Sequence, residues 1–283
     1  MRTIERRIEY SGRGTWFTFY NLTDIHGGSV HCAEKKFDKI IAEIAADPCA
    51  YWGLGGDWCE FISKDDPRYK ASEVAPWALV DSKGRGIDDI AEAQEQWIFG
   101  KLAPIADKNL WINGGNHEET IRRHTNRSAY KNMVEFIKEK SGHNDELGLG
   151  YRGFVRVRFH RPGHTNTLTI FAEHGAGGGQ LRGGIVNKVE RYFGYYPAAD
   201  LIFTGHVHKC DVFPHSCQTP AGKVVKFGAI CGTFYDDDPP KKQDEMDTGN
   251  YADGKGYNPT DVMGVKIKYN PDTKEMKGTV FAY

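Results

Sequence analysis

Five short apolar runs recur along the chain, and each has the length and the aromatic or β-branched composition of a buried strand. They cover residues 16–20, 51–54, 109–113, 168–171 and 201–203. Aspartate, asparagine, glutamate or histidine follows each run within a few positions. Because the carboxyl ends of parallel strands meet at one edge of a layered α/β fold, this pattern indicates a functional site built from strand ends.

The segments between these runs have the patterns of helices and of further strands. The first two runs flank a predicted helix, and such a β-α-β unit predicts a parallel pair of strands. Residues 1–10 and the alternating stretch 153–160 are predicted as strands, and antiparallel strands are expected from Lys223 onward around a polar loop at about 236–262. Helices are predicted at about 33–46, 87–102 and 183–193, with one amphipathic helix within 119–150.

The composition is that of an ordinary soluble globular protein. The chain has 283 residues, of which 39% are hydrophobic and 27% are charged. A chain of this length is able to form one large domain, and no repeat or linker divides it. The formal net charge of -1 argues against a protein that binds nucleic acid by bulk charge alone.

Three features predict a cytoplasmic protein. The chain has no run of about 18 apolar residues, so no transmembrane helix and no membrane partner are expected. Its first residues lack the apolar core of a secretory signal. Its cysteines, at positions 32, 49, 59, 210, 217 and 231, form no CxxC pair, which favours free thiols over a disulfide framework. None of these features predicts an oligomeric state.

Seven side chains near the ends of the runs offer oxygen or nitrogen donors to a metal ion. They are Asp24, His26, Asp57, Asn116, His174, His206 and His208. Seven donors exceed the four of a tetrahedral zinc site, and they suit two ions that share one carboxylate. Because these donors include carboxylates and imidazoles without a thiolate, we expect two divalent metal ions, with Mn²⁺ first and Fe or Zn²⁺ as alternatives.

The order of these motifs resembles that of the calcineurin-like metallophosphoesterase superfamily. Each motif is short, but five in this order, each after a predicted strand, are specific. The resemblance implies an α/β fold in which two sheets pack between layers of helices, an α/β/β/α sandwich. The motifs are Asp24-Ile25-His26, Gly56-Asp57, Gly115-Asn116-His117-Glu118, His174 and Gly205-His206-Val207-His208.

The resemblance also implies a role for each residue. A hydroxide that bridges the two ions would attack phosphorus, and His117 would act on the leaving group. In the protein phosphatase branch an aspartate orients this histidine from the position that Glu60 occupies here, so we expect Glu60 to support His117. The first ion would be bound by Asp24, His26 and His208, the second by Asn116, His174 and His206, and both by Asp57.

The segments around the motifs suggest how a substrate is recognised. We interpret residues 1–283 as a single metallophosphoesterase domain with cap insertions at about 61–95 and 119–150, because the connections there are long for the superfamily. Arg122 and Arg123 follow the third motif closely and are candidate contacts to a substrate phosphate. A solvated helix face is the alternative interpretation of these two arginines.

The glycine-rich stretch 174–179 resembles superfamily members carried by bacteriophages, and the chain resembles the nuclease and phosphodiesterase branch most. We therefore expect a phosphodiesterase that acts on nucleic acid or nucleotides. A phosphomonoesterase, including a protein phosphatase, is the first alternative. A scaffold that keeps the fold but not the reaction, as the retromer subunit of the superfamily does, is the second. The presence of all eight motif positions opposes this second alternative.

Overall fold

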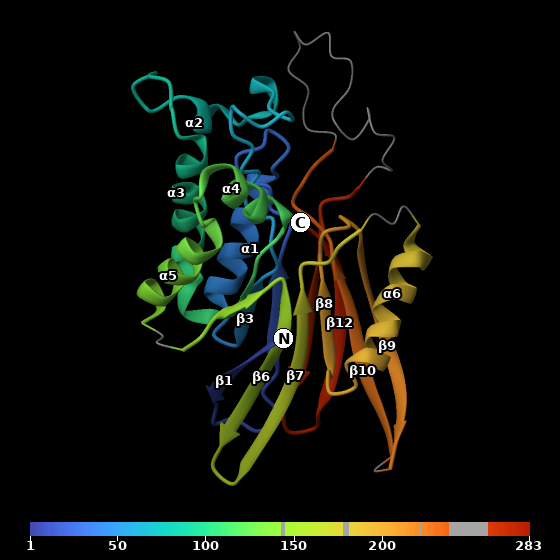
Figure 1. The fold of residues 1–283 in the computed structure, drawn as a ribbon. Helices are drawn as coiled ribbons and strands as arrows, with labels where there is room; N and C mark the ends of the chain where they lie inside the picture. Colours follow the sequence, from blue (N-terminus) through green and yellow to red (C-terminus); the bar gives the residue numbers. More distant parts are fainter. Residues whose placement is uncertain (143–144, 178–180, 221, 238–259) are drawn as a thin grey trace.

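The computed structural model describes residues 1–142, 145–177, 181–220, 222–237 and 260–283. Within these ranges, two mixed sheets of six strands each pack against one another. Helices α1 to α5 lie on one side of the pair of sheets and α6 lies on the other (Figure 1). The predicted α/β/β/α sandwich is therefore confirmed.

The two sheets have the strand orders β1-β6-β7-β8-β10-β9 and β12-β11-β2-β3-β4-β5. In that order, the strands of the first sheet span Arg2–Glu9, Arg152–Arg161, His164–Glu173, Leu201–Thr204, Gly222–Cys231 and Cys210–Thr219. Those of the second span Glu275–Ala282, Met263–Asn270, Phe17–Leu22, Ala50–Leu54, Asn109–Asn113 and Gly148–Gly150. Helices α1 to α6 span Glu34–Ala46, Pro76–Leu79, Ile90–Leu102, Asn116–Thr125, Ala129–Ser141 and Arg182–Tyr195.

The five apolar runs of the sequence form the strands β2, β3, β4, β7 and β8, as predicted. Strand β2 shows why these runs are continuous rather than alternating. Phe17 and Phe19 face the other sheet, whereas Tyr20 and Leu22 face the helices, so both faces of the strand are buried. Strands β2, β3 and β4 are parallel neighbours, which brings their carboxyl ends to the same edge of the sheet.

Aromatic side chains fill the core between the two sheets. The ring of Phe159 on β6 is fully buried, with its centroid 4.9 Å from that of Phe17 and 5.4 Å from that of Tyr269. Trp111 on β4 stacks on Phe203 on β8 with 5.7 Å between the ring centroids. These contacts join strands of different sheets, so they also fix where the ends of those strands lie relative to one another.

The prediction of one helix within 119–150 was wrong, because α4 and α5 both contribute to this segment. Helix α4 lacks an apolar periodicity, since Ile121 is its only buried apolar residue. Its ends are instead set by polar contacts. The N–H of Gly115 donates to Oε2 of Glu118 at 2.7 Å, and Asn126 ends the helix with a left-handed φ of 58°.

The two segments predicted as cap insertions lie in different surroundings. Within 61–95, Val74 pairs with Ser29 of the loop that follows the first motif. Helix α5 and strand β5, within the second segment, instead belong to the sandwich, because Met133 of α5 is fully buried and β5 pairs with β4. The role of either segment in covering a cleft stays a prediction.

The remaining predictions concern the cysteines, the membrane and the C-terminal region. All six cysteines are free, as expected. None of the helices in the described part of the chain has the length and apolarity needed to cross a membrane. The antiparallel pair β11–β12 forms where antiparallel strands were predicted, from Lys223 onward. Strand β10 lies almost wholly in that segment too, but its antiparallel partner β9 precedes it and was not predicted. Most of the predicted polar loop at 236–262 lies outside the described residues.

Truncation of Phe159 tests the core between the sheets. Phe159→Ala should lower the free energy of unfolding by about 3–5 kcal/mol, because the cavity it leaves is lined by packed rings. Tyr195→Ala, at an exposed position on α6, is the control and should change this free energy by less than about 0.5 kcal/mol. Urea denaturation followed by circular dichroism measures both. Equal stability of the two variants would show that the rings do not hold the sheets together.

Candidate metal centre

The seven predicted metal ligands converge at one end of the sandwich. The donor atoms of Asp24, His26 and His208 lie within 4.8 Å of one another, and so do those of Asp57, His174 and His206. Asn116 adjoins the second group, with its Oδ1 3.2 Å from Nε2 of His174. The folded chain thus gathers residues that are up to 184 positions apart, from Asp24 to His208.

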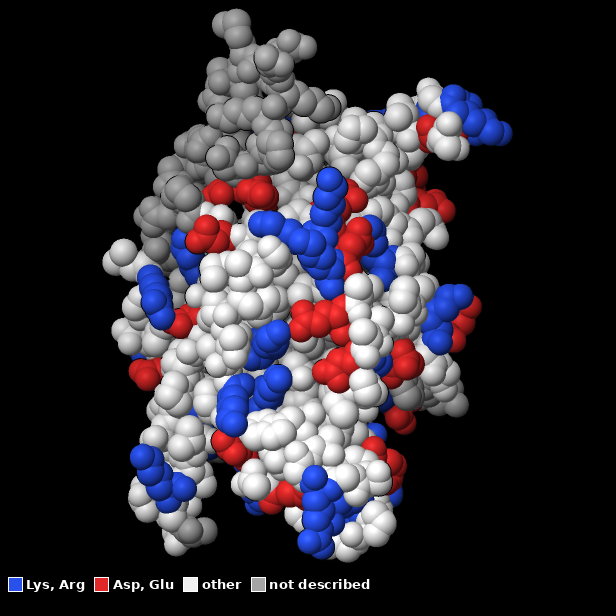
Figure 2. Space-filling view, turned by 180° about the vertical axis from the view of Figure 1, so that it is seen from behind, with Lys and Arg blue, Asp and Glu red and all other residues white. Residues whose placement is uncertain are grey.

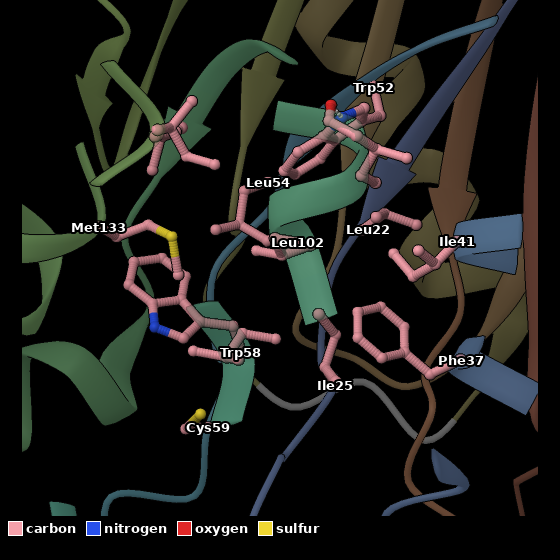
Figure 3. Close-up of a cluster of buried hydrophobic side chains, with 14 of the residues drawn as sticks. Leu22, Ile25, Phe37, Ile41, Trp52, Leu54, Trp58, Cys59, Leu102 and Met133 are labelled. Carbon is pink, nitrogen blue, oxygen red and sulfur yellow. Dashed lines mark hydrogen bonds between the residues drawn. The ribbon is translucent and has the colours of Figure 1, made fainter. Parts of the chain in front are cut away.

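Apolar residues next to the ligands anchor the loops that carry them. Ile25 lies between the first two ligands in the sequence, and Trp58 follows Asp57. Both side chains are fully buried in the apolar cluster that also contains Leu54 and Phe37 (Figure 3). Burial of these anchors fixes the loops, so the ligands are held in place before an ion binds.

The backbone of the centre is strained at five ligands. Left-handed φ costs residues other than glycine about 1 kcal/mol or more, so it persists only where the surrounding structure imposes it. Such residues cluster at functional sites. The angles are 51° at Asp24, 52° at His26, 50° at Asp57, 71° at His206 and 51° at His208.

Close backbone contacts explain two glycines of the motifs. A Cβ atom at Gly115 would lie 2.1 Å from Oδ1 of Asp57, and one at Gly205 would lie 2.7 Å from Oδ2 of Asp24. Neither distance is compatible with a side chain. Glycine therefore precedes Asn116 and His206 because the loops that carry these ligands pass directly against the carboxylates.

In two of these histidines, Nδ1 forms a hydrogen bond to another group of the protein. Nδ1 of His174 donates to the carbonyl oxygen of Gly55 at 2.8 Å, and Nδ1 of His26 lies 2.8 Å from Oε2 of Glu60. In the neutral form of each ring, Nε2 then carries the lone pair. Metal-binding histidines are oriented in this way in proteins. The Nε2 atoms of His26 and His208 are 3.1 Å apart, as expected for two ligands of one ion.

The surroundings of the Asp24 carboxylate test whether these residues fit a cation. Its Oδ2 accepts hydrogen bonds from Oγ1 of Thr23 at 2.6 Å and from the N–H of His206 at 2.8 Å. Its Oδ1 is buried and forms no hydrogen bond of good geometry among the described residues, although Nε2 of His208 lies 3.3 Å away. A buried carboxylate oxygen without a good hydrogen bond is costly, and a cation shared with His208 would satisfy it. The residues present therefore fit divalent metal ions.

The charges in the centre shift the pKa values of its groups. Burial raises the pKa of Asp57, but the imidazoles of His117 and His174 lower it by more, so this carboxylate is ionised. Burial also opposes the low pKa of Glu60, which His117 and His26 bring to about 2. For His174, burial lowers the pKa, but the charge of Asp57 raises it to about 10. The carboxylates of Asp57 and Glu60 are therefore ionised and would attract cations.

Glu118 is a buried residue of the centre whose role the sequence analysis missed. Its carboxylate accepts hydrogen bonds from the backbone N–H groups of Asp57 at 3.0 Å, Trp58 at 3.1 Å and Gly115 at 2.7 Å. Burial and the charge of Asp57 raise its pKa to about 7. Glu118 thus ties the loop after β3 to the loop after β4. The sequence signal for this role was a glutamate three residues after Gly115, the glycine that caps helix α4.

The two predicted catalytic residues, His117 and Glu60, contact each other through a different group from the one expected. His117 lies in the centre, where its ring contacts that of His26 at 4.9 Å between centroids. Its Nδ1 donates to the main-chain carbonyl of Glu60 at 2.5 Å rather than to the carboxylate. Burial would lower the pKa of His117, but the charges of Asp57 and Glu60 raise it.

Arg122 and Arg123 are not brought into the cluster of donors. Both are exposed on α4 and pair with Glu119, at 2.7 Å from Nη2 of Arg122 and at 2.8 Å from Nε of Arg123. They lie one to two turns along the helix from Asn116, which carries them away from the ligands. A direct contact with substrate stays a prediction for these two residues.

Comparison with known proteins gives similarity at the level of structure. No protein-family model and no curated protein matches the chain. It is similar to a conserved uncharacterised protein, a predicted phosphoesterase, from Streptococcus pneumoniae TIGR4, with 11% identity, a TM-score of 0.32, and 95% of this chain and 99% of that chain covered. It is also similar to wild-type Vps29 complexed with Zn²⁺ from Entamoeba histolytica, with 10% identity, a TM-score of 0.35, and coverage of 94% and 98%.

Replacement of Gly115 tests the close contact with Asp57. Gly115→Ala should weaken Mn²⁺ binding by about tenfold or more, because the added methyl group displaces the carboxylate. Gly100→Ala on α3 is the matched control, since nothing lies within 4 Å of its added Cβ. Isothermal titration calorimetry with Mn²⁺ compares the two variants. Equal affinity for Mn²⁺ would show that this contact does not position a metal ligand.

Proposed function

We propose that this protein is a phosphoester hydrolase that works with two divalent metal ions. The observation that carries the proposal is the convergence of seven oxygen and nitrogen donors from five strand ends, among them the buried Oδ1 of Asp24, which faces Nε2 of His208 at 3.3 Å. The sandwich and the order of the motifs agree with the resemblance to the calcineurin-like metallophosphoesterase superfamily. Because no motif position is lost, the residues support an enzyme over a scaffold.

The two groups of donors divide naturally between two ions. Ions bound there would generate a nucleophile from water at neutral pH and neutralise charge on the phosphoryl oxygens. Oxygen and imidazole donors without thiolate support Mn²⁺, with Fe or Zn²⁺ as alternatives. In this proposal Asp24, His26 and His208 hold one ion, Asn116, His174 and His206 hold the other, and Asp57 contacts both.

His117 is the residue that we propose to act on the leaving group. Its Nδ1 is occupied by the carbonyl oxygen of Glu60, so Nε2 is the atom able to give a proton to the departing oxygen. Its backbone N–H donates to Oδ1 of Asp57 at 2.9 Å, which ties the position of His117 to the shared carboxylate. In this proposal the imidazole would lie beside the ions and act on the substrate, although one of its ring nitrogens also lies within 4.8 Å of donor atoms of His26 and Glu60.

We propose a phosphodiester in nucleic acid or a nucleotide as the substrate. Arg122 and Arg123 lie on the exposed side of α4, the helix whose first residue is the ligand Asn116. On the face shown in Figure 2, Lys and Arg side chains are interspersed with Asp and Glu. Together with the net charge of -1, this distribution favours recognition of a substrate by a few local contacts rather than by bulk charge.

Two substitutions separate the catalytic residue from the metal ligands. His117→Ala should lower kcat by about a hundredfold or more while the Mn²⁺ content stays that of the wild type. Asp57→Asn should instead lose Mn²⁺, because the shared charge is removed. Metal analysis of the purified variants and steady-state kinetics measure both effects. Full activity of the first variant, or full Mn²⁺ occupancy and activity of the second, would refute these roles.

A comparison of two model esters tests the substrate class. With Mn²⁺ bound, the protein should cleave bis-p-nitrophenyl phosphate with a higher kcat/KM than p-nitrophenyl phosphate. The absorbance of released p-nitrophenolate measures both reactions, and the Asp57→Asn protein serves as the blank for contaminating phosphatases. Much faster cleavage of the monoester would replace the proposed phosphodiesterase by a phosphomonoesterase.

A further inference from the structure

Glu60 contributes two different groups to the centre. Its side-chain Oε2 lies 2.8 Å from Nδ1 of His26, whereas its main-chain carbonyl oxygen lies 2.5 Å from Nδ1 of His117. The carboxylate oxygen closest to His117 is Oε1, and the 4.0 Å that separates it from Nδ1 is beyond hydrogen-bond distance. The carboxylate therefore binds one imidazole and the carbonyl binds another.

The carbonyl of Glu60 is positioned by the backbone around it. The N–H of Glu60 donates to the carbonyl oxygen of Gly27 at 3.0 Å. The following residue, Phe61, is buried and donates its own N–H to Oε1 of Gln94 at 2.7 Å. None of these contacts involves the side chain of Glu60. The orientation of His117 therefore does not depend on the carboxylate.

The carboxylate of Glu60 instead determines the tautomer of His26. A hydrogen bond from Nδ1–H of His26 to the carboxylate selects the tautomer that has its lone pair on Nε2, and it makes that nitrogen more basic. Nε2 faces the Nε2 atom of His208, 3.1 Å away, which is the other imidazole of the first group. The side chain of Glu60 is only 19% exposed, so water competes weakly for this hydrogen bond.

We propose that Glu60 is a positioning residue for the first metal ion: its carboxylate acts through His26, and it does not orient His117 by a hydrogen bond. This inference rests on the proposed function, because it takes His26 to be a metal ligand. A glutamate is one methylene group longer than the aspartate expected from the resemblance, which explains how the carboxylate extends to His26. One residue thus supports two imidazoles through separate groups.

Calorimetric titration with Mn²⁺ tests the proposal on Glu60→Ala and Glu60→Gln. Glu60→Ala should weaken one of the two Mn²⁺ sites by about 10–100-fold. Its turnover should be low at limiting Mn²⁺ and should rise again as Mn²⁺ is added. Glu60→Gln should keep most of the affinity, because its amide oxygen still accepts from Nδ1–H of His26. Glu119→Ala removes the same charge from the nearby α4 and should leave both sites unchanged.

Two results would overturn the proposal. Wild-type affinity for both Mn²⁺ ions in the folded Glu60→Ala protein would show that the carboxylate does not position His26. If this came with a loss of turnover of about a hundredfold that excess Mn²⁺ does not restore, the carboxylate would act through His117 instead. A wild-type protein that binds no Mn²⁺ would overturn the proposed function as well, so the two failures are distinguishable.

Discussion

The centre depends on direct contacts between the strand ends of two different sheets. The N–H of His206, which follows β8 of one sheet, donates to the carboxylate of Asp24, which follows β2 of the other. The side-chain Nδ1 of His174, which follows β7, donates to the main-chain carbonyl oxygen of Gly55 after β3. Each group of donors includes residues from both sheets. The packing between the sheets therefore sets the distance between the metal ligands.

This arrangement costs folding free energy, which contacts elsewhere in the fold offset. Ionised carboxylates and imidazoles are buried together, and several ligands adopt left-handed backbone conformations. Large apolar side chains beside the ligands, such as Ile25 and Trp58, oppose this cost by anchoring the loops. A cation that binds only the folded state would add its binding free energy to stability. Bound cations would therefore compensate the negative charge of the buried carboxylates.

The sequence allowed the strands to be predicted, and also the gathering of the predicted metal ligands at one place, because each of these residues follows an apolar run within a few positions. That these residues bind metal stays a prediction. Helix α4 was missed because its buried side chains are mainly polar, as His117 and Glu118 show. The pairing of Arg122 and Arg123 with Glu119 was predictable from their spacing of three and four residues on one helix.

Sequence patterns could not predict the hydrogen-bond partners of Glu60. Position 60 matched the place of an orienting carboxylate, and the residue does support His117, but through its main-chain carbonyl. Which imidazole the carboxylate binds depends on the length and rotamer of one side chain and on contacts with His26, 34 positions away. Motif spacing carries no information about such a choice.

Anomalous scattering from a crystal soaked in Mn²⁺ would test the central claim most directly. The account predicts two anomalous peaks about 3.5–4 Å apart, with the carboxylate of Asp57 in contact with both. One peak should lie among Asp24, His26 and His208, and the other beside His174. A single peak, or peaks remote from Asp57, would contradict the claim that the strand ends of both sheets build a two-metal centre.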